Sequence, residues 1–227
     1  MKTKKYYILP LILLCTLKSF SQDDFKDYKF GVNTGITYSN MIGDGIVKNS
    51  WINGISYVNN PASDKYIVGK KFGIELEKGV SKIFSWGVAL NYEEKGCKIP
   101  IVGNADANIR LRYLVIPATI ESNFKYFYLQ AGLYCGTLLI AKDYGTVLLN
   151  GKEYNYNGNF DRYSLFDLGA LFSIGINIPF ENESVLKFGL KGNWNLNGVE
   201  RRGMTPKQDK FYNQSYCFEI RYLYKFK

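Results

Sequence analysis

Large apolar or aromatic residues alternate with small or polar residues in eight separate stretches of this chain. The last stretch shows the pattern most clearly, because Tyr216, Phe218, Ile220 and Tyr222 alternate with partners such as Glu219. Successive side chains of a strand point to opposite faces, so each stretch predicts a strand with one apolar face. The eight stretches are 30–38, 72–76, 86–92, 114–120, 127–133, 168–176, 186–194 and 216–226.

The connections between these strands alternate between long and short. Tight turns are expected at 79–82, 123–125 and 181–183. Longer links are expected at 40–67, 97–108, 142–164 and 197–212. This alternation is typical of an up-and-down meander whose long loops all lie at one end. The fold class predicted is therefore all-β, a single closed antiparallel up-and-down transmembrane barrel of about eight strands.

The size of the barrel interior favours one of the two possible orientations of the apolar face. An eight-stranded interior is barely wide enough for side chains to fill, so Trp, Phe, Tyr, Ile and Leu from every strand would overfill it. The face rich in Gly, Ala, Ser and Asn fits that space, and the bulky face then suits lipid. We expect short periplasmic turns and long extracellular loops. The opposite orientation would indicate a soluble secreted ligand-binding barrel.

The N-terminal segment has the features of a secretory signal peptide. A basic start, KTKK, precedes the apolar run YYILPLILLCTL and the small-x-small site Ser19-Phe20-Ser21. This run is too short for an ordinary membrane-spanning helix. We expect residues 1–21 to be removed and residues 22–227 to form one outer-membrane domain. A lipid-modified Cys15 is disfavoured, because bulky Leu14 precedes it.

Charge and composition exclude several classes of function. The formal net charge is +9, but part of it lies in the predicted signal peptide, and no clustered basic stripe indicates a nucleic-acid partner. The chain contains no His, which removes the commonest general base, most zinc sites and the usual serine or cysteine catalytic arrangements. We therefore expect no enzymatic activity, no cofactor and no metal.

Charged residues on the small face are candidates for ion pairs across the lumen. Glu75 and Glu77 share a face, whereas Glu93 and Glu94 lie on opposite faces and cannot form a catalytic pair. Tyr128 is expected to narrow the lumen further, with Tyr134 and Leu171, so no open channel is expected. The lumenal charge candidates are Glu75, Glu77, Glu93, Lys187, Lys191, Glu219 and Arg221.

Two kinds of residue are expected near the two membrane surfaces, namely arginines that could bind phosphate and aromatic girdle residues. Arg110 and Arg112 have the lipid-facing parity just above apolar Leu114, and arginine suits phosphate contact. They are candidates for binding lipopolysaccharide phosphates, the alternative being solvated charges at the rim. Aromatic girdle positions are expected at Tyr222, Tyr224 and Phe226 on the periplasmic side, Tyr92 near the outer side and Trp86 opposite it.

The first long loop is unusually apolar for a solvated segment. Its loop contact candidates are Trp51, Ile52, Ile55 and Tyr57. These residues make this loop the expected contact surface for a partner.

Three cysteines remain after the predicted signal peptide. Cys97, Cys135 and Cys217 are an odd number without close spacing, so they do not form a disulfide framework. The favoured interpretation is that these cysteines serve as small side chains at strand positions. The alternative of one disulfide and one free thiol stays open.

Three motifs carry a resemblance to a known family. The run YEEKGCK at 92–98 is similar to the Y-x-x-K-G-x-K strand end of the PorT-like outer-membrane β-barrel family. YLVIPATIESNFK at 113–125 resembles that family's Y-L-x-I-P segment, and FYLQAGLYCGTLLIAK at 127–142 resembles its aromatic, Ala-Gly, Tyr-x-Gly strand. The resemblance implies a single barrel in a Gram-negative outer membrane. The member that names the family is tied to a secretion system, a role that no motif here marks.

These observations together predict a non-enzymatic outer-membrane barrel with a structural or surface-interaction role through its extracellular loops. The expected partners are outer-membrane lipid, lipopolysaccharide and a protein at the outer loops or the periplasmic face. An accessory subunit of a secretion or envelope assembly is the alternative role.

Overall fold

The computed structural model describes residues 28–42, 51–52, 55–56, 65–101, 105–149, 152–158, 163–199 and 212–225. The predicted signal peptide, the loop residue Tyr57 and the girdle residue Phe226 lie outside these ranges. The strands are β1 (Tyr28–Ile42), β2 (Trp51–Ile52), β3 (Ile55–Ser56), β4 (Ile67–Gly79), β5 (Phe84–Ile101), β6 (Ala105–Asn123), β7 (Phe127–Leu149), β8 (Lys152–Gly158), β9 (Phe166–Pro179), β10 (Val185–Asn195) and β11 (Tyr212–Lys225). The described segments hold no helix of a length and apolarity that would cross a membrane.

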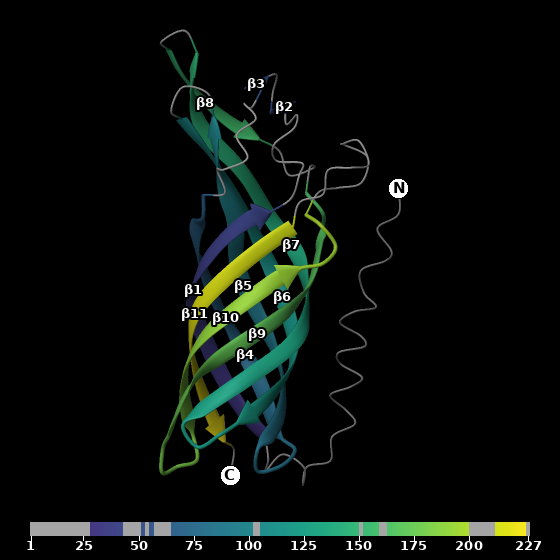
Figure 1. Cartoon of the computed structure of the whole chain (residues 1–227), viewed down its shortest axis with the longest axis vertical. Helices are drawn as coiled ribbons and strands as arrows, with labels where there is room; N and C mark the ends of the chain where they lie inside the picture. The colour runs from purple at the N-terminus through teal and green to yellow at the C-terminus, as the bar shows by residue number, and fades with distance from the viewer. Residues whose placement is uncertain are drawn as a thin grey trace.

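Eight of these strands close into a barrel. The strand order is β6-β5-β4-β1-β11-β10-β9-β7, and a further pairing of β6 with β7 completes the ring (Figure 1). Every pairing is antiparallel, including that of the first strand β1 with the last strand β11, in which Ile36 faces Phe218. The predicted fold class is confirmed.

The short turns lie at one end of the barrel. They connect β4 to β5, β6 to β7 and β9 to β10, close to where β11 ends at the C-terminal end in Figure 1. The longer connections lie at the opposite end. In the expected orientation, the end with the short turns is the periplasmic end and the other is the outer end.

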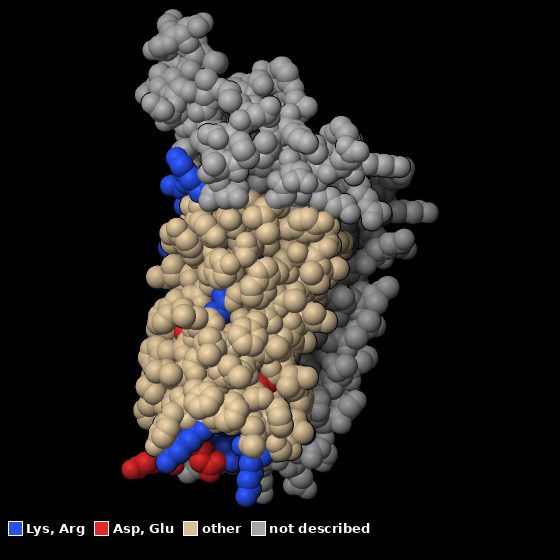
Figure 2. All heavy atoms as spheres, viewed as in Figure 1, with Lys and Arg blue, Asp and Glu red and all other residues tan. Residues whose placement is uncertain are grey.

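The bulky face points outward, as the sequence predicts. On β11, Phe218 is 48% exposed and Tyr222 is 40% exposed, whereas Glu219 is 1% and Arg221 is 4% exposed. The uncharged surface in Figure 2 extends over the middle of the visible face, and charged side chains gather at the end with the short turns. This is the reverse of the arrangement that a soluble barrel requires.

Two of the expected long links are wrong. β5 continues to Ile101 and β6 begins at Ala105, so most of the 97–108 segment is strand. The 142–164 segment continues β7 to Leu149, which then pairs with Lys152 of β8. In both segments the strands continue to pair through their backbones, although apolar and polar residues no longer alternate along the sequence. That alternation is expected only where one face of a strand lies against lipid.

Candidate functional site

Arg221, on β11, is the centre of a buried ion-pair network in the periplasmic half of the lumen. Its Nε lies 2.9 Å from Glu75, and its terminal nitrogens lie 2.7 Å from Glu121 and 3.4 Å from Glu77. Lys187 Nζ, on β10, lies 2.9 Å from Glu77 and also contacts Glu121. These five side chains are at most 10% exposed, so their charges are stabilised by one another rather than by water.

Glu219 forms a second group of charges in the middle of the lumen. Its Oε2 contacts Lys71 Nζ and lies 4.0 Å from Lys191 Nζ. Glu219 and Arg221 are two residues apart on the inward face of β11. This one strand therefore supplies both the central carboxylate of the second group and the central guanidinium of the network around Arg221.

Lys95, on β5, forms the third group, nearer the outer end. Its Nζ lies 2.8 Å from Asp167 Oδ2 on β9 and 3.5 Å from Glu93 Oε2. The same ammonium group lies 4.4 Å from the centre of the Tyr134 ring, and Tyr134 Oη donates to Asp167 Oδ1 at 3.2 Å. The cation is therefore held by two carboxylates and an aromatic face.

The structure places all seven lumenal charge candidates inside the ring. Four further lumenal charges, Lys71, Lys95, Glu121 and Asp167, were not among the candidates. Each occupies an inward position one to three residues beyond an apolar stretch, so extending the alternation past those stretches would have found them. Each buried carboxylate has a cation within 4.0 Å, so the arrangement cross-links the wall of the barrel.

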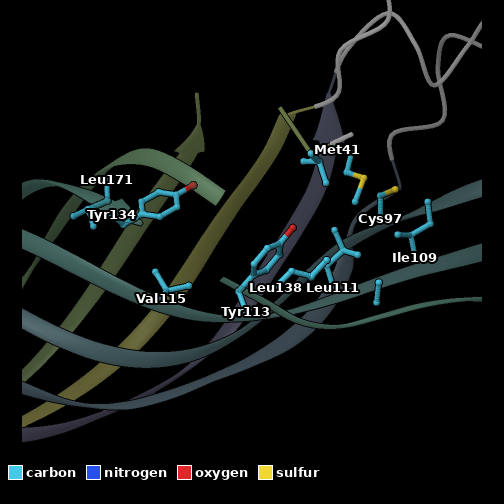
Figure 3. Close-up of a cluster of buried hydrophobic side chains, with 11 residues drawn as sticks. Met41, Cys97, Ile109, Leu111, Tyr113, Val115, Tyr134, Leu138 and Leu171 are labelled. Atoms are coloured by element: carbon cyan, nitrogen blue, oxygen red, sulfur yellow. The ribbon is translucent and has the colours of Figure 1, made fainter. Parts of the chain in front are cut away.

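An apolar cluster closes the lumen at its outer end. The side chains come from β1, β5, β6, β7 and β9 and from the segment after β10, and they meet in the interior (Figure 3). Asn213 Nδ2 donates to Tyr113 Oη at 3.4 Å within it. The cluster comprises Met41, Cys97, Ile109, Leu111, Tyr113, Val115, Tyr134, Leu138, Ala141, Leu171 and Val199. Water therefore meets an apolar barrier between the outer end and the charged groups.

The space left in the lumen is small. A cavity of about 20 Å³ lies among Asn33, Glu75 and Gln130, which is room for about one water molecule. Tyr128, 0% exposed, fills the lumen beside it, and Lys187 Nζ lies 5.4 Å from the centre of its ring. The periplasmic mouth is wider, at about 310 Å³, and is lined by residues including Lys29 and Lys225. Side chains therefore narrow the described lumen between its middle and its periplasmic mouth.

A group of charged side chains lies on the outer face of the wall, near the outer end. We name Lys70, Glu94, Arg110, Arg112 and Lys142 the outer cationic cluster. Arg112 Nε lies 3.0 Å from Glu94 Oε1, and Arg110 Nη1 lies 3.9 Å from Glu94 Oε2. Lys142 pairs with Arg110 across the β6–β7 ladder, and both Lys70 and Lys142 are exposed. The predicted lipid-facing parity of the two arginines agrees with this placement.

The expected girdle residues lie on the outer face. Tyr92 stacks on Phe72, with ring centres 4.8 Å apart, and Trp86 lies edge-on to Tyr28 at 6.3 Å. Tyr222 and Tyr224 are exposed near the periplasmic end. Aromatic side chains therefore flank the apolar exterior.

The loop candidates are described only in their backbone. Trp51 pairs with Ser56 and Ile52 with Ile55 in a two-stranded ladder, β2–β3. The three cysteines after the predicted signal peptide are free thiols, with Cys97 and Cys217 buried in the lumen and Cys135 exposed on the outer face. Among the described residues, no group of three or more Cys, Asp or Glu is placed to hold a metal ion.

A closed ring with an apolar exterior and a lumen filled by charged pairs defines a membrane-spanning β-barrel of the outer-membrane type. No protein-family model matches the chain, and no curated protein matches it.

Solved structures of outer-membrane proteins share the general architecture. Ail, the attachment invasion locus protein of Yersinia pestis, is 12% identical, with 87% of this chain and 99% of Ail covered and a TM-score of 0.41. Neisserial surface protein A is also 12% identical, with 87% and 97% covered and a TM-score of 0.43. The outer membrane protease OmpT from Escherichia coli is 11% identical, with 88% and 95% covered and a TM-score of 0.39. The fold assignment rests on the strand pairing of this chain and not on these similarities.

Proposed function

We propose that this protein is a non-enzymatic barrel of the outer membrane and that it acts through the parts of the chain beyond the outer leaflet. The observation that carries this proposal is the filled lumen. The apolar cluster closes the outer end, and the buried carboxylates below it are engaged with cations. Side chains that occupy the described lumen in this way support a role for the exterior of the barrel.

The strands that extend past the membrane support a surface role. The ten residues from Ile140 to Leu149 of β7 span about 30 Å of extended chain, and β8 pairs with the last seven of them. This β7–β8 arm rises above the ring in Figure 1. A paired arm holds the loops that it carries away from the membrane, where another surface or protein can reach them.

Complementation of a strain that lacks the protein tests this proposal. The strain receives the full chain, a chain whose β7–β8 arm is shortened to an Asn-Gly turn after Tyr144, or a chain without 51–56. We expect both shortened chains to restore detergent resistance of the envelope but to lose at least half of the surface interaction that the full chain restores, measured as cell adhesion. Unheated and boiled gel samples verify that each barrel is folded. Full adhesion with both shortened chains would contradict a role in the outer parts.

The narrower assignments stay predictions. Membership of the PorT-like family rests on the three sequence motifs. None of these motifs marks a role in secretion, and an accessory subunit of a secretion or envelope assembly stays the alternative. Mild crosslinking in intact membranes tests the accessory role, because a subunit of an assembly gives a stable product of fixed mass.

A further inference from the structure

The outer cationic cluster is confined to one half of the barrel. Its members lie on β4, β5, β6 and β7, and they contribute four cations against one carboxylate. On the outer ends of β9, β10, β11 and β1, the described outward side chains are uncharged, as Leu168, Trp194, Gln214 and Ile42 illustrate. A general requirement for charge at the rim would place cations all round the ring, so this one-sided cluster calls for a specific explanation.

The cluster lies at the level of the outer membrane surface. Ile120 of β6 faces Trp86 near the periplasmic end of the barrel, and Arg110 lies ten residues further along the same strand. Ten residues span about 33 Å of strand, or about 25 Å along the barrel axis at the usual tilt, which is the height of the apolar band of such barrels. Arg110 and Arg112 are therefore at the boundary between hydrocarbon and the headgroups of the outer leaflet.

The two guanidinium groups are held in place before any ligand arrives. Glu94 Oε1 lies 3.0 Å from Arg112 Nε and accepts a hydrogen bond from Tyr92 Oη, also at 3.0 Å. Arg110 Nε donates to Tyr144 Oη at 2.7 Å. Each arginine side chain is about one third exposed, 33% for Arg110 and 32% for Arg112, against 12% for Glu94. The carboxylate thus orients the arginines from beneath, and the guanidinium groups remain accessible from outside.

Arg110 reaches across the neighbouring strand β5 towards β4. Gly96 of β5 pairs with Arg110, and Arg110 Nη1 approaches the carbonyl oxygen of Val68 on β4 at 3.4 Å. A side chain at Gly96 would collide with the backbone of Ile109, and its φ of 151° is unfavourable for other residues. The guanidinium group of Arg110 therefore lies beside β4, the strand that also carries the exposed Lys70.

The wall below the cluster is apolar. Leu114 is exposed on the periplasmic side of Arg112, Ile140 is exposed directly across the β6–β7 ladder from Arg112, and the stacked rings of Phe72 and Tyr92 lie on the neighbouring strands. A cationic site above an apolar wall matches an amphiphile with a phosphate at the membrane surface and acyl chains beneath it.

We propose that the outer cationic cluster binds a phosphate group of lipopolysaccharide, with the acyl chains lying against β5, β6 and β7. Lipopolysaccharide fits better than a phospholipid of the inner leaflet, because the cluster lies at the outer end of the barrel. The inference depends on the membrane-spanning orientation and not on the outer loops, so it stands or fails separately from the proposed role of the outer parts of the chain.

Native mass spectrometry of the folded barrel in detergent micelles tests the inference with four added ligands. These are lipid A with both phosphates, dephosphorylated lipid A, phosphatidylglycerol and inorganic phosphate. The variant Arg110→Gln/Arg112→Gln removes both guanidinium groups. The matched control Lys82→Gln/Lys125→Gln removes two exposed charges from the short turns at the opposite end. Heat modifiability on a gel verifies that both variants fold.

We expect the unaltered barrel to retain phosphorylated lipid A about tenfold more strongly than the arginine variant does. The lysine control should retain it as the unaltered barrel does, and dephosphorylated lipid A should bind both variants weakly. Equal retention of phosphorylated and dephosphorylated lipid A would overturn the phosphate site. Phosphatidylglycerol or inorganic phosphate binding as strongly as lipid A would overturn the choice of lipopolysaccharide.

Discussion

Arg221 on β11 and Glu121 on β6 form an ion pair at 2.7 Å across the full width of the barrel. The two strands are four positions apart in either direction round the ring, so the pair joins opposite walls. Arg221 also holds Glu75 of β4 at 2.9 Å, which makes this one guanidinium a link among three strands.

Replacing Arg221 with Met should strongly destabilise the barrel. The variant leaves the buried carboxylate of Glu75 without its cation and Glu121 with Lys187 alone, and breaking a buried pair in this way costs about 3–5 kcal/mol. Urea titration of the barrel in phosphocholine vesicles measures the free energy of unfolding. The matched control is Lys225→Met, which breaks the exposed pair with Glu183 and should cost less than about 1 kcal/mol. Equal losses in the two variants would contradict the network.

Gly175 should not tolerate a side chain, because the Tyr128 ring packs over it. A Cβ at Gly175 would meet the carbonyl oxygen of Phe188 and the ring of Tyr128. Gly175→Ala should therefore lower the free energy of unfolding by about 1–3 kcal/mol. At Gly79 a Cβ would have no neighbour within 4 Å. Gly79→Ala should therefore change the free energy of unfolding by less than about 0.5 kcal/mol. The same urea titration compares the two, and a harmless Gly175→Ala would show that Tyr128 does not fill the lumen in solution.

The barrel should not conduct ions. The apolar cluster and the paired charges leave a cavity of about 20 Å³ inside the described lumen. In planar bilayers we expect no current steps above those of the lipid alone. Stable steps of uniform size from the folded protein would contradict a closed lumen.

The three thiols after the predicted signal peptide should differ in reactivity. Cys135 is exposed on the outer face, whereas Cys97 and Cys217 are buried within the ring. An apolar maleimide should modify Cys135 alone in the folded barrel, and all three thiols after unfolding in urea. Mass spectrometry of the labelled peptides reads the result. Fast modification of Cys217 in the folded protein would mean that the lumen is open to reagents.

The sequence was sufficient to predict the closed ring of strands and to predict which side chains face the lumen and which face outward. The alternation places Glu219 and Arg221 on one face and Phe218 on the other, and the limited interior volume decides which face is inside. The partner of each lumenal charge could not be predicted in the same way. Whether Arg221 meets Glu121 or another acid depends on the stagger of strands round the ring, which strand periodicity does not encode.

The alternation of apolar and polar residues also could not predict where the strands end. The β7–β8 arm keeps its backbone ladder after the lipid-facing stretch ends, so Val147 and Tyr154 pair where the apolar alternation is no longer required. The sequence singles out Arg110 and Arg112 of the outer cationic cluster but not Lys70, Glu94 and Lys142, for a related reason. The members of this cluster lie on four strands, and only the register of β5 with β6 and of β6 with β7 brings them together.

The outward direction of the apolar face is the central claim, and spin labels on β11 test it most directly. Single cysteines replace Phe218, Tyr222, Ser215 or Leu223 in a chain without other cysteines, and each is labelled in urea before refolding into lipid vesicles. Oxygen, which concentrates in hydrocarbon, should relax the labels at 218 and 222 strongly and those at 215 and 223 weakly. Strong relaxation at 215 and 223 with shielding at 218 and 222 would show that the small, polar face meets the lipid, and the account would be wrong.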